Sequence, residues 1–301
     1  MKKFMTIILL LAIALTGANA QLLYKISGKD IKQPSYIVGT YHLAPVSFVD
    51  SIPGLRSAMD ATAQVCGELD MTDMMSGENM QKMMAAMMLP DGKTLKDVLT
   101  ADEMSKLNKF LMENMGMDLT NPMLEQQMGK MTPQALNTQI ALLMYMKITP
   151  GFDPTNLFDG YFQKAATEKQ KPVIGLETVD YQIKVLFQGT TIERQKELLM
   201  CTINNPDRAI LSTQDLVKAF YAQDIDKIKE VMDQEYNDNC DSTPEEEDAL
   251  LKNRNIEWIA KMPAIMNSNS TLFAVGAGHL PGEYGVLNLL KNAGYTVEAV
   301  K

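Results

Sequence analysis

Two stretches at opposite ends of the chain decide the fold: Ser35–His42, SYIVGTYH, and Thr271–His279, TLFAVGAGH. Each is a short apolar run typical of a strand, and each ends in a histidine three residues after a glycine. The chain has only 2 histidines and 18 glycines among 301 residues, so the repeated Gly-x-x-His pattern is a specific signal. We interpret each glycine as a tight turn that places the next side chains at the carboxyl edge of a sheet. His42 and His279 are therefore predicted to share one pocket.

Two glutamates stand at the ends of two further predicted strands. Glu68 follows the run Val65-Cys66, and Glu177 follows Val173–Leu176. Four strand ends would thus offer two imidazoles and two carboxylates, a set that can hold a divalent cation or serve as general acid and base. The competing interpretation is that each glutamate is only an exposed loop residue or a helix cap.

The pattern around these stretches predicts an α/β fold with a mixed β-sheet core and flanking helices. Most of residues 71–262 follow helical periodicity between Gly and Pro breakers. We expect a single domain over 21–301 in which residues 71–170 form a large Met-rich helical insert, or cap. Shorter helices are expected over Pro53–Ala63, with Pro53 in the first turn, and over 283–292. Thr243-Pro244 is expected to open a long capped helix. The predicted strands cover residues 22–26, 35–38, 63–69, 171–177, 271–276 and 294–300.

Methionine is concentrated in the predicted insert. Of the 24 methionines, 17 lie between Met71 and Met146, several of them at helical spacing. Three interpretations stay open: ordinary core filling, an adaptable groove for peptides or lipids, and capture of a soft metal.

The N-terminal segment predicts export. Residues 1–20, MKKFMTIILLLAIALTGANA, combine two lysines, an apolar run and an A-x-A site, which together are typical of a cleaved signal peptide. We expect a mature chain that begins near Gln21, carries no transmembrane segment and is periplasmic or secreted. Because disulfides persist in such compartments, we predict a Cys201–Cys240 bridge. Cys66, in a strand-like run, is expected to be a buried free thiol.

Composition and absent motifs exclude several classes of protein. The chain is 46% hydrophobic and 22% charged, which is ordinary for a globular protein and excludes a disordered or multi-span membrane chain. The formal net charge of -9 disfavours binding to nucleic acid. Neither H-E-x-x-H nor G-x-S-x-G occurs, so neither a zincin nor an α/β-hydrolase serine is supported.

The order of the motifs resembles the TraB/GumN family, which includes the Tiki proteases and is related to the erythromycin-esterase/ChaN-like superfamily. The resemblance covers roughly residues 22–300 and is carried by Gly39-Thr40-x-His42, Glu68-Leu69-Asp70, Gly175-Leu176-Glu177-Thr178, Arg254-Asn255 and Gly276-Ala277-Gly278-His279-Leu280. It implies a metal-dependent protease. By this resemblance His42, His279, Glu68 and Glu177 are the candidate metal ligands. Glu68, Glu177 and Arg254 are the candidate catalytic residues, and Asn255 matches without an assigned role.

Two hypotheses about function use the same residues. The first is a secreted metal-dependent hydrolase, a peptidase, whose divalent ion (Mn, Co or Zn) activates water for attack on a peptide or small-molecule substrate. The alternative is a module that binds haem or another metal complex without catalysis. A structural envelope protein with a decayed site is a third interpretation, which the intact histidines and glutamates disfavour. The planar fork of Arg254 suits a carboxylate of a site glutamate or of a substrate.

Overall fold

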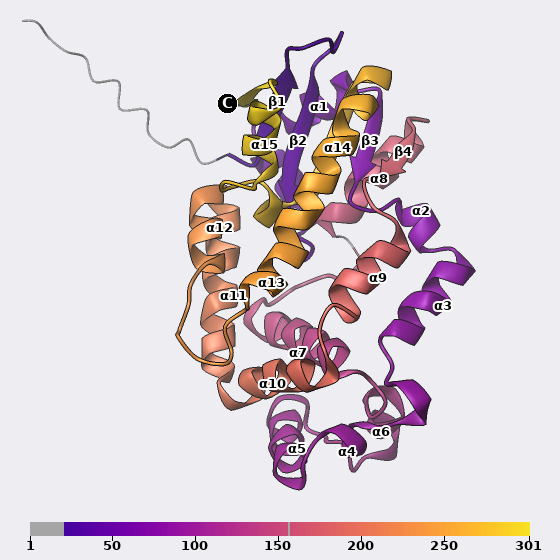
Figure 1. The fold of residues 1–301 in the computed structure, drawn as a ribbon, viewed down its shortest axis with the longest axis vertical. Helices are drawn as coiled ribbons and strands as arrows, with labels where there is room; N and C mark the ends of the chain where they lie inside the picture. Colours follow the sequence, from indigo (N-terminus) through magenta and orange to yellow (C-terminus); the bar gives the residue numbers. More distant parts are fainter. Residues whose placement is uncertain (1–20, 156) are drawn as a thin grey trace, which may run out of the picture.

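The computed structural model describes residues 21–155 and 157–301, which form a mixed sheet flanked by helices (Figure 1). The strands are β1 (Leu23–Ser27), β2 (Ser35–Thr40), β3 (Gln64–Gly67), β4 (Val173–Gly175), β5 (Thr271–Gly276) and β6 (Thr296–Ala299). They lie in the order β4-β3-β5-β2-β1-β6. Strands β4, β3, β5 and β2 run parallel to one another, whereas β1 is antiparallel to both β2 and β6. The predicted α/β class is confirmed; the predicted signal peptide, residues 1–20, lies outside the described residues.

Helices fill the long connections between the parallel strands. Between β2 and β3 lie η1 (Val46–Ser51) and α1 (Leu55–Ala61). Between β3 and β4 lie α2 (Met71–Met74), α3 (Gly77–Ala86), η2 (Pro90–Gly92), α4 (Leu95–Val98), α5 (Ala101–Met115), α6 (Pro122–Met128), α7 (Pro133–Ile148) and α8 (Phe158–Glu168). Between β4 and β5 lie α9 (Val179–Phe187), α10 (Ile192–Asn204), α11 (Pro206–Tyr221), α12 (Ile225–Met232), α13 (Pro244–Glu247), a π-helical turn (Asp248–Lys252) and α14 (Asn253–Ser268). After β5 come η4 (Ala277–His279) and α15 (Val286–Asn292).

The molecule has two main apolar cores. One lies around the sheet, where strands such as β5 are buried on both faces, as parallel strands covered by helices usually are. The other lies among α4–α7 and α10, which Figure 1 shows at the end of the molecule remote from the sheet. It is built from fully buried side chains, among them Leu107, Leu111, Leu136, Ile140 and Leu199.

The register of the parallel strands brings their carboxyl ends to one edge of the sheet. Thr40 at the end of β2 pairs with Gly276 of β5, and Gly67 at the end of β3 pairs with both Ala274 of β5 and Gly175 of β4. The residues that follow these four strands must therefore emerge at the same edge, which is where open α/β sheets bind ligands.

Two of the predicted helices begin later than the sequence pattern indicated. We expected Pro53 in the first turn of a helix, but α1 begins at Leu55 because Gly54 adopts a left-handed conformation with a φ of 72°. The helix expected from residue 283 begins at Val286, after the N-cap Gly285. The helix expected at Thr243 does begin there, and a capping box between Thr243 and Glu246 closes its first turn.

The methionines of α2 and α3 are only partly core residues. Met74 and Met83 pack against a small buried cluster, as the core-filling interpretation expects. Others on the same segment are exposed, with 64% of Met75 and 59% of Met84 accessible to solvent, so core filling does not account for them.

Both predictions about cysteine are confirmed. Cys201 at the end of α10 and Cys240 form a disulfide with a Cα–Cα distance of 5.7 Å. Cys66 is a buried free thiol, and burial raises its pKa to about 12. Among the described residues, none of the helices combines the length and apolarity needed to cross a bilayer.

Candidate functional site

Arg254, near the start of α14, is the centre of a buried polar cluster at the carboxyl edge of the sheet. Its Nε and Nη2 donate to the two oxygens of Glu177 over 2.7 and 2.9 Å, and Nη2 also donates to Glu68 over 2.7 Å. Its Nη1 lies 3.1 Å from Nε2 of His279 and donates to the carbonyl of Leu250 over 3.2 Å. One planar guanidinium, on a side chain that is 5% exposed, thus joins residues that follow three different strands.

Glu177, which follows β4, has hydrogen-bond donors on both oxygens. Its Oε1 accepts from Arg254 and from Trp258 Nε1 over 2.8 Å, and its Oε2 accepts from Arg254 and from Gln182 Nε2 over 3.4 Å. The side chain is 0% exposed. Because each oxygen already has two partners, this carboxylate is placed to neutralise and orient Arg254.

Glu68, which follows β3, keeps capacity for a further partner. Its Oε1 accepts from the amide of Gly276 over 2.8 Å, and its Oε2 accepts from Arg254 and from Gln182 over 3.3 Å. Burial opposes ionisation of this carboxyl, but Arg254, the Gly276 amide and, where it is protonated, His279 outweigh it and hold the pKa of Glu68 below its ordinary value. Glu68 is therefore ionised at neutral pH, and within the described residues one lone pair of Oε1 has no hydrogen-bond donor.

His279 is held in one tautomer by Asn255. The amide nitrogen of Asn255 donates to the carbonyls of Tyr284 and His279 over 2.8 and 3.3 Å, so its oxygen faces Nδ1 of His279 at 2.7 Å. Nδ1 must then carry the proton, which leaves the lone pair on Nε2, where Arg254 Nη1 donates. Burial lowers the pKa of His279 to about 4, so the ring is neutral at pH 7. The Trp258 ring lies 4.3 Å from it, centroid to centroid.

His42 has a different environment from His279. Its Nδ1 is hydrogen-bonded to Oδ2 of Asp159, in the first turn of α8, and 75% of its side chain is exposed. The bond to Asp159 raises the pKa of His42 to about 9; the charge of Glu68 acts in the same direction, and that of Arg254 opposes it. Within residues 21–155 and 157–301, His42 makes no hydrogen bond to the Arg254 cluster. The pocket shared by the two histidines stays a prediction.

The glycines of the two Gly-x-x-His motifs allow close packing. The interpretation that the glycine turns the chain is wrong for Gly39, which lies within β2. The chain does turn after Gly276, the N-cap of η4, but its φ of -51° does not require glycine. A Cβ on Gly39 would lie 2.8 Å from Leu280 Cδ1, so its absence lets the η4 segment pack on β2. A Cβ on Gly276 would lie 3.3 Å from Oε1 of Glu68, which instead reaches the Gly276 amide.

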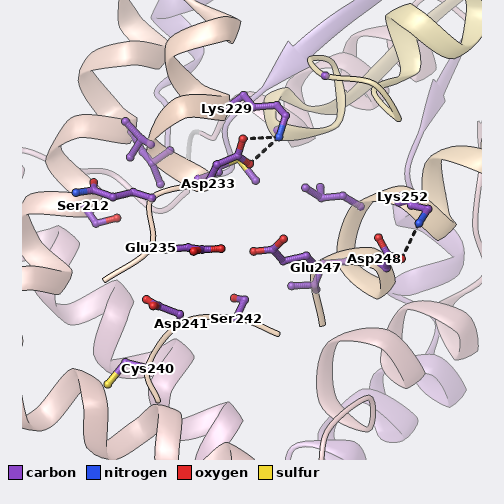
Figure 2. A pocket seen from close by; sticks show the side chains of 18 of the residues that line it. Ser212, Lys229, Asp233, Glu235, Cys240, Asp241, Ser242, Glu247, Asp248 and Lys252 are labelled. Carbon is purple, nitrogen blue, oxygen red and sulfur yellow. Dashed lines mark hydrogen bonds and ion pairs between the residues drawn. The ribbon is translucent and has the colours of Figure 1, made fainter. Parts of the chain in front are cut away.

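A cavity of about 970 Å³ adjoins the Arg254 cluster, and Arg254, Asn255 and His279 form part of its wall. Figure 2 shows several carboxylates on another part of the wall: Asp233, Glu235, Asp241, Glu247 and Asp248. Lys229 and Lys252 also line it, and each is paired with a carboxylate of its own helical segment. The volume lies near the upper end of the range for ligand-binding pockets, so a ligand could reach His279 and Arg254 from this side.

The donor atoms fit a divalent cation in their chemistry. Nε2 of His279 and Oε1 of Glu68 lie 3.9 Å apart, a separation that two ligand bonds of about 2.0–2.2 Å can span. The Nδ1 atoms of His42 and His279 are both bound to oxygen acceptors, as they are in most metal-ligating histidines. In the part of the chain that the structure describes, no three His, Cys, Asp or Glu side chains yet gather closely enough to enclose an ion. The chemistry of the His279 and Glu68 pair therefore suits a divalent ion, provided that Arg254 Nη1 releases Nε2 of His279 and that His42 moves closer to the pair.

Several members of the site were missed in the sequence. Trp258 is the single tryptophan and lies four residues after Arg254, a spacing that places both side chains on the same face of a helix. This spacing could have predicted that Trp258 lies beside Arg254 in the site, where it binds Glu177. Asn255 stands in a recognised motif, but its bond to His279 could not be inferred from it. Gln182 and Asp159 carry no local signal, because both reach the site through tertiary packing of α9 and α8.

Comparison with known proteins gives a family match over nearly the whole chain. The sequence model of the TraB/PrgY/gumN family matches residues 22–299. The chain is similar to the metalloprotease TIKI2 of Danio rerio, at 25% identity over 307 residues that cover 88% of this chain and 58% of the relative. It is similar to the human metalloprotease TIKI1, at 25% identity over 308 residues, covering 88% of this chain and 59% of the relative. The chain therefore spans a little under three fifths of these two relatives. No solved structure matches it significantly.

Proposed function

Because the chain belongs to the TraB/PrgY/gumN family, we propose that it is an exported, metal-dependent hydrolase of peptide bonds. The observation that carries the proposal is that Nδ1 of each histidine is bound to an oxygen acceptor, Asp159 for His42 and Asn255 for His279. Nε2 is thereby left as the atom of each ring that can bind an ion, once His42 loses its Nε2 proton and Arg254 Nη1 releases His279. The two rings follow the neighbouring parallel strands β2 and β5. The names of the relatives, metalloproteases, support both the metal and the reaction.

We assign three residues to the ion: His42, His279 and Glu68. A bound divalent ion would supply an activated water and polarise the carbonyl of the scissile bond. Glu68 suits the part of a ligand because its Oε1 lies 3.9 Å from Nε2 of His279 and accepts only one hydrogen bond from the described residues, that of the Gly276 amide. Glu177 is assigned to hold Arg254, since both of its oxygens are already engaged.

Arg254 supplies positive charge beside the position at which negative charge develops on the substrate oxygen. Its guanidinium lies in a buried cluster, where a charge acts more strongly than in water. The adjoining cavity of about 970 Å³ is large enough for several residues of an extended substrate. The predicted signal peptide and the Cys201–Cys240 disulfide support action outside the cytoplasm.

Metal-dependent turnover of a peptide library tests the proposal. The purified chain is stripped with a chelator and assayed with quenched fluorescent peptides, alone and with Mn²⁺, Co²⁺ or Zn²⁺. We expect cleavage only with added metal, and loss of at least about 100-fold in kcat/KM for Glu68→Gln, as is usual when a group acting at the reacting atoms is removed. Glu113→Gln is the matched control, because Glu113 is an exposed glutamate on α5.

The proposal fails if cleavage of every peptide is equal with and without metal, or if Glu68→Gln keeps wild-type kcat/KM. Circular dichroism of both variants shows that any loss is not due to unfolding. Absence of cleavage by the wild-type chain with all three metals would also contradict the assigned reaction.

A further inference from the structure

We propose that Asp159 is a positioning residue that orients His42 for ion binding, an inference that rests on the function proposed above. Asp159 accepts a hydrogen bond from Nδ1 of His42 through Oδ2. In doing so it fixes the ring so that Nε2, and not Nδ1, is the atom that can lose its proton and bind an ion at the edge of the sheet. Asp159 lies outside all the motifs that mark the family resemblance.

The bond to Asp159 is the main restraint on the ring of His42. Three quarters of the His42 side chain is exposed, so packing alone does not hold it. His279, in contrast, is held by Asn255 and packs against Trp258, and only 6% of its side chain is exposed. Loss of the acceptor should therefore free the ring of His42 to rotate, whereas the ring of His279 would stay in place.

The helix that carries Asp159 is itself firmly anchored. Phe158 and Phe162 are fully buried in the core around the sheet, and α8 packs against β3, β4 and β5. This anchoring places the Asp159 carboxylate at a defined point relative to β2. The insert between β3 and β4 thus contributes a side chain to the site.

The second oxygen of Asp159 is also informative. Within the described residues, Oδ1 is buried and has no hydrogen-bond partner. A buried carboxylate oxygen without a donor is costly, so a carboxylate that only stabilised the fold would be expected to have both oxygens satisfied. In the described part of the chain, the Asp159 carboxylate has a single side-chain partner, His42, which is a candidate ligand.

The test compares Asp159→Ala and Asp159→Asn with Asp102→Ala. Asp102 is a matched control because it is also the second residue of a helix, α5, and is exposed. Two-bond ¹H–¹⁵N correlation spectra of the full chain contain only two histidine rings, and His42→Gln assigns them. Calorimetric titration of the stripped chain with Co²⁺ or Zn²⁺ measures affinity.

We expect Asp159→Ala to move the Nδ1 nitrogen shift of His42 and to weaken metal binding by about 10- to 100-fold, as loss of such a supporting acceptor usually does. Asp159→Asn keeps an acceptor oxygen, so it should retain the Nδ1 shift and lose less affinity. Asp102→Ala should change neither.

An Asp159→Ala chain that is folded and keeps both the wild-type Nδ1 shift and the wild-type affinity overturns the assignment. If that variant does not fold, Asp159→Asn decides: a folded chain whose Nδ1 shift matches that of a free histidine overturns it as well. If the wild-type chain binds neither metal, the proposed function fails. The NMR spectra still test the contact in that case. If Asp159→Ala leaves the Nδ1 shift of His42 unchanged, Asp159 does not orient the ring.

Discussion

Replacing Arg254 with methionine should destabilise the protein strongly, because the cluster around it would lose its only described cation. Methionine has a similar length and no charge, so the substitution removes the hydrogen bonds to Glu68, Glu177 and His279 while filling much of the same space. The two carboxylates would remain buried, with side chains 14% and 0% exposed. Removal of one partner from a buried ion pair usually costs about 3–5 kcal/mol, and we expect a loss in this range.

Urea unfolding at pH 7 and at pH 4 measures this loss. The pKa of Glu68 in the folded wild-type chain lies below its unfolded value, so its stabilising contribution is present above about pH 4.3 and is lost as the pH falls through the folded value. Without Arg254, burial raises the pKa of the same carboxyl and protonation relieves its penalty. The difference in unfolding free energy between wild type and variant should therefore shrink from pH 7 to pH 4.

Two further variants make the result interpretable. Arg254→Lys keeps the charge but cannot form the paired bonds to Glu177, so it should lose less than Arg254→Met. Arg56→Met removes an arginine whose ion pair with Asp50 is exposed, and it should leave the urea midpoint close to wild type. An exposed ion pair contributes up to about 1 kcal/mol. If Arg254→Met lowers the unfolding free energy by less than this, or by the same amount at pH 7 and pH 4, Arg254 does not neutralise buried carboxylates as described.

Two other predictions concern the disulfide and the buried histidine. Reduction of Cys201–Cys240, which closes a loop with a sequence separation of 39, should lower the unfolding free energy by about 4 kcal/mol in the loop-entropy model; urea curves that coincide with and without reductant would contradict it. His279 has a folded pKa of about 4, below its unfolded value of about 6.5, so the unfolded chain takes up the proton first and stability should fall as the pH drops from 6.5 to 4. An NMR titration in which His279 titrates near pH 6.5 would show that the ring is not buried as described.

The strand ends and their residues could be predicted because the relevant signals are local. An apolar run followed by Gly-x-x-His shows where a strand ends and which side chain follows. A cysteine in a helical pattern and a second one in a polar loop, Cys201 and Cys240, indicate a disulfide in a chain that is predicted to be exported. The parallel register then brings these ends together without further information, because each pairing is set by backbone hydrogen bonds.

The internal contacts of the site could not be predicted because they depend on how helices pack across the sheet. The sequence around Arg254 is also compatible with an exposed arginine on a helix. The packing of α14 brings its side chain to Glu68 and Glu177. Asp159 follows an apolar residue at the start of a helix, which is an ordinary place for a carboxylate near a helix N-terminus. The function of Gly39 was misread for a related reason, since the close approach of Leu280 is a tertiary contact.

A crystal structure of the chain loaded with Co²⁺, with anomalous scattering to locate the ion, tests the central claim most directly. We expect an anomalous peak about 2.0–2.2 Å from Nε2 of His279, Nε2 of His42 and a carboxylate oxygen of Glu68. Nη1 of Arg254 should then no longer lie within hydrogen-bond distance of His279. A crystal with no peak at this edge of the sheet, or with a peak bound elsewhere while Arg254 still donates to His279, would contradict it.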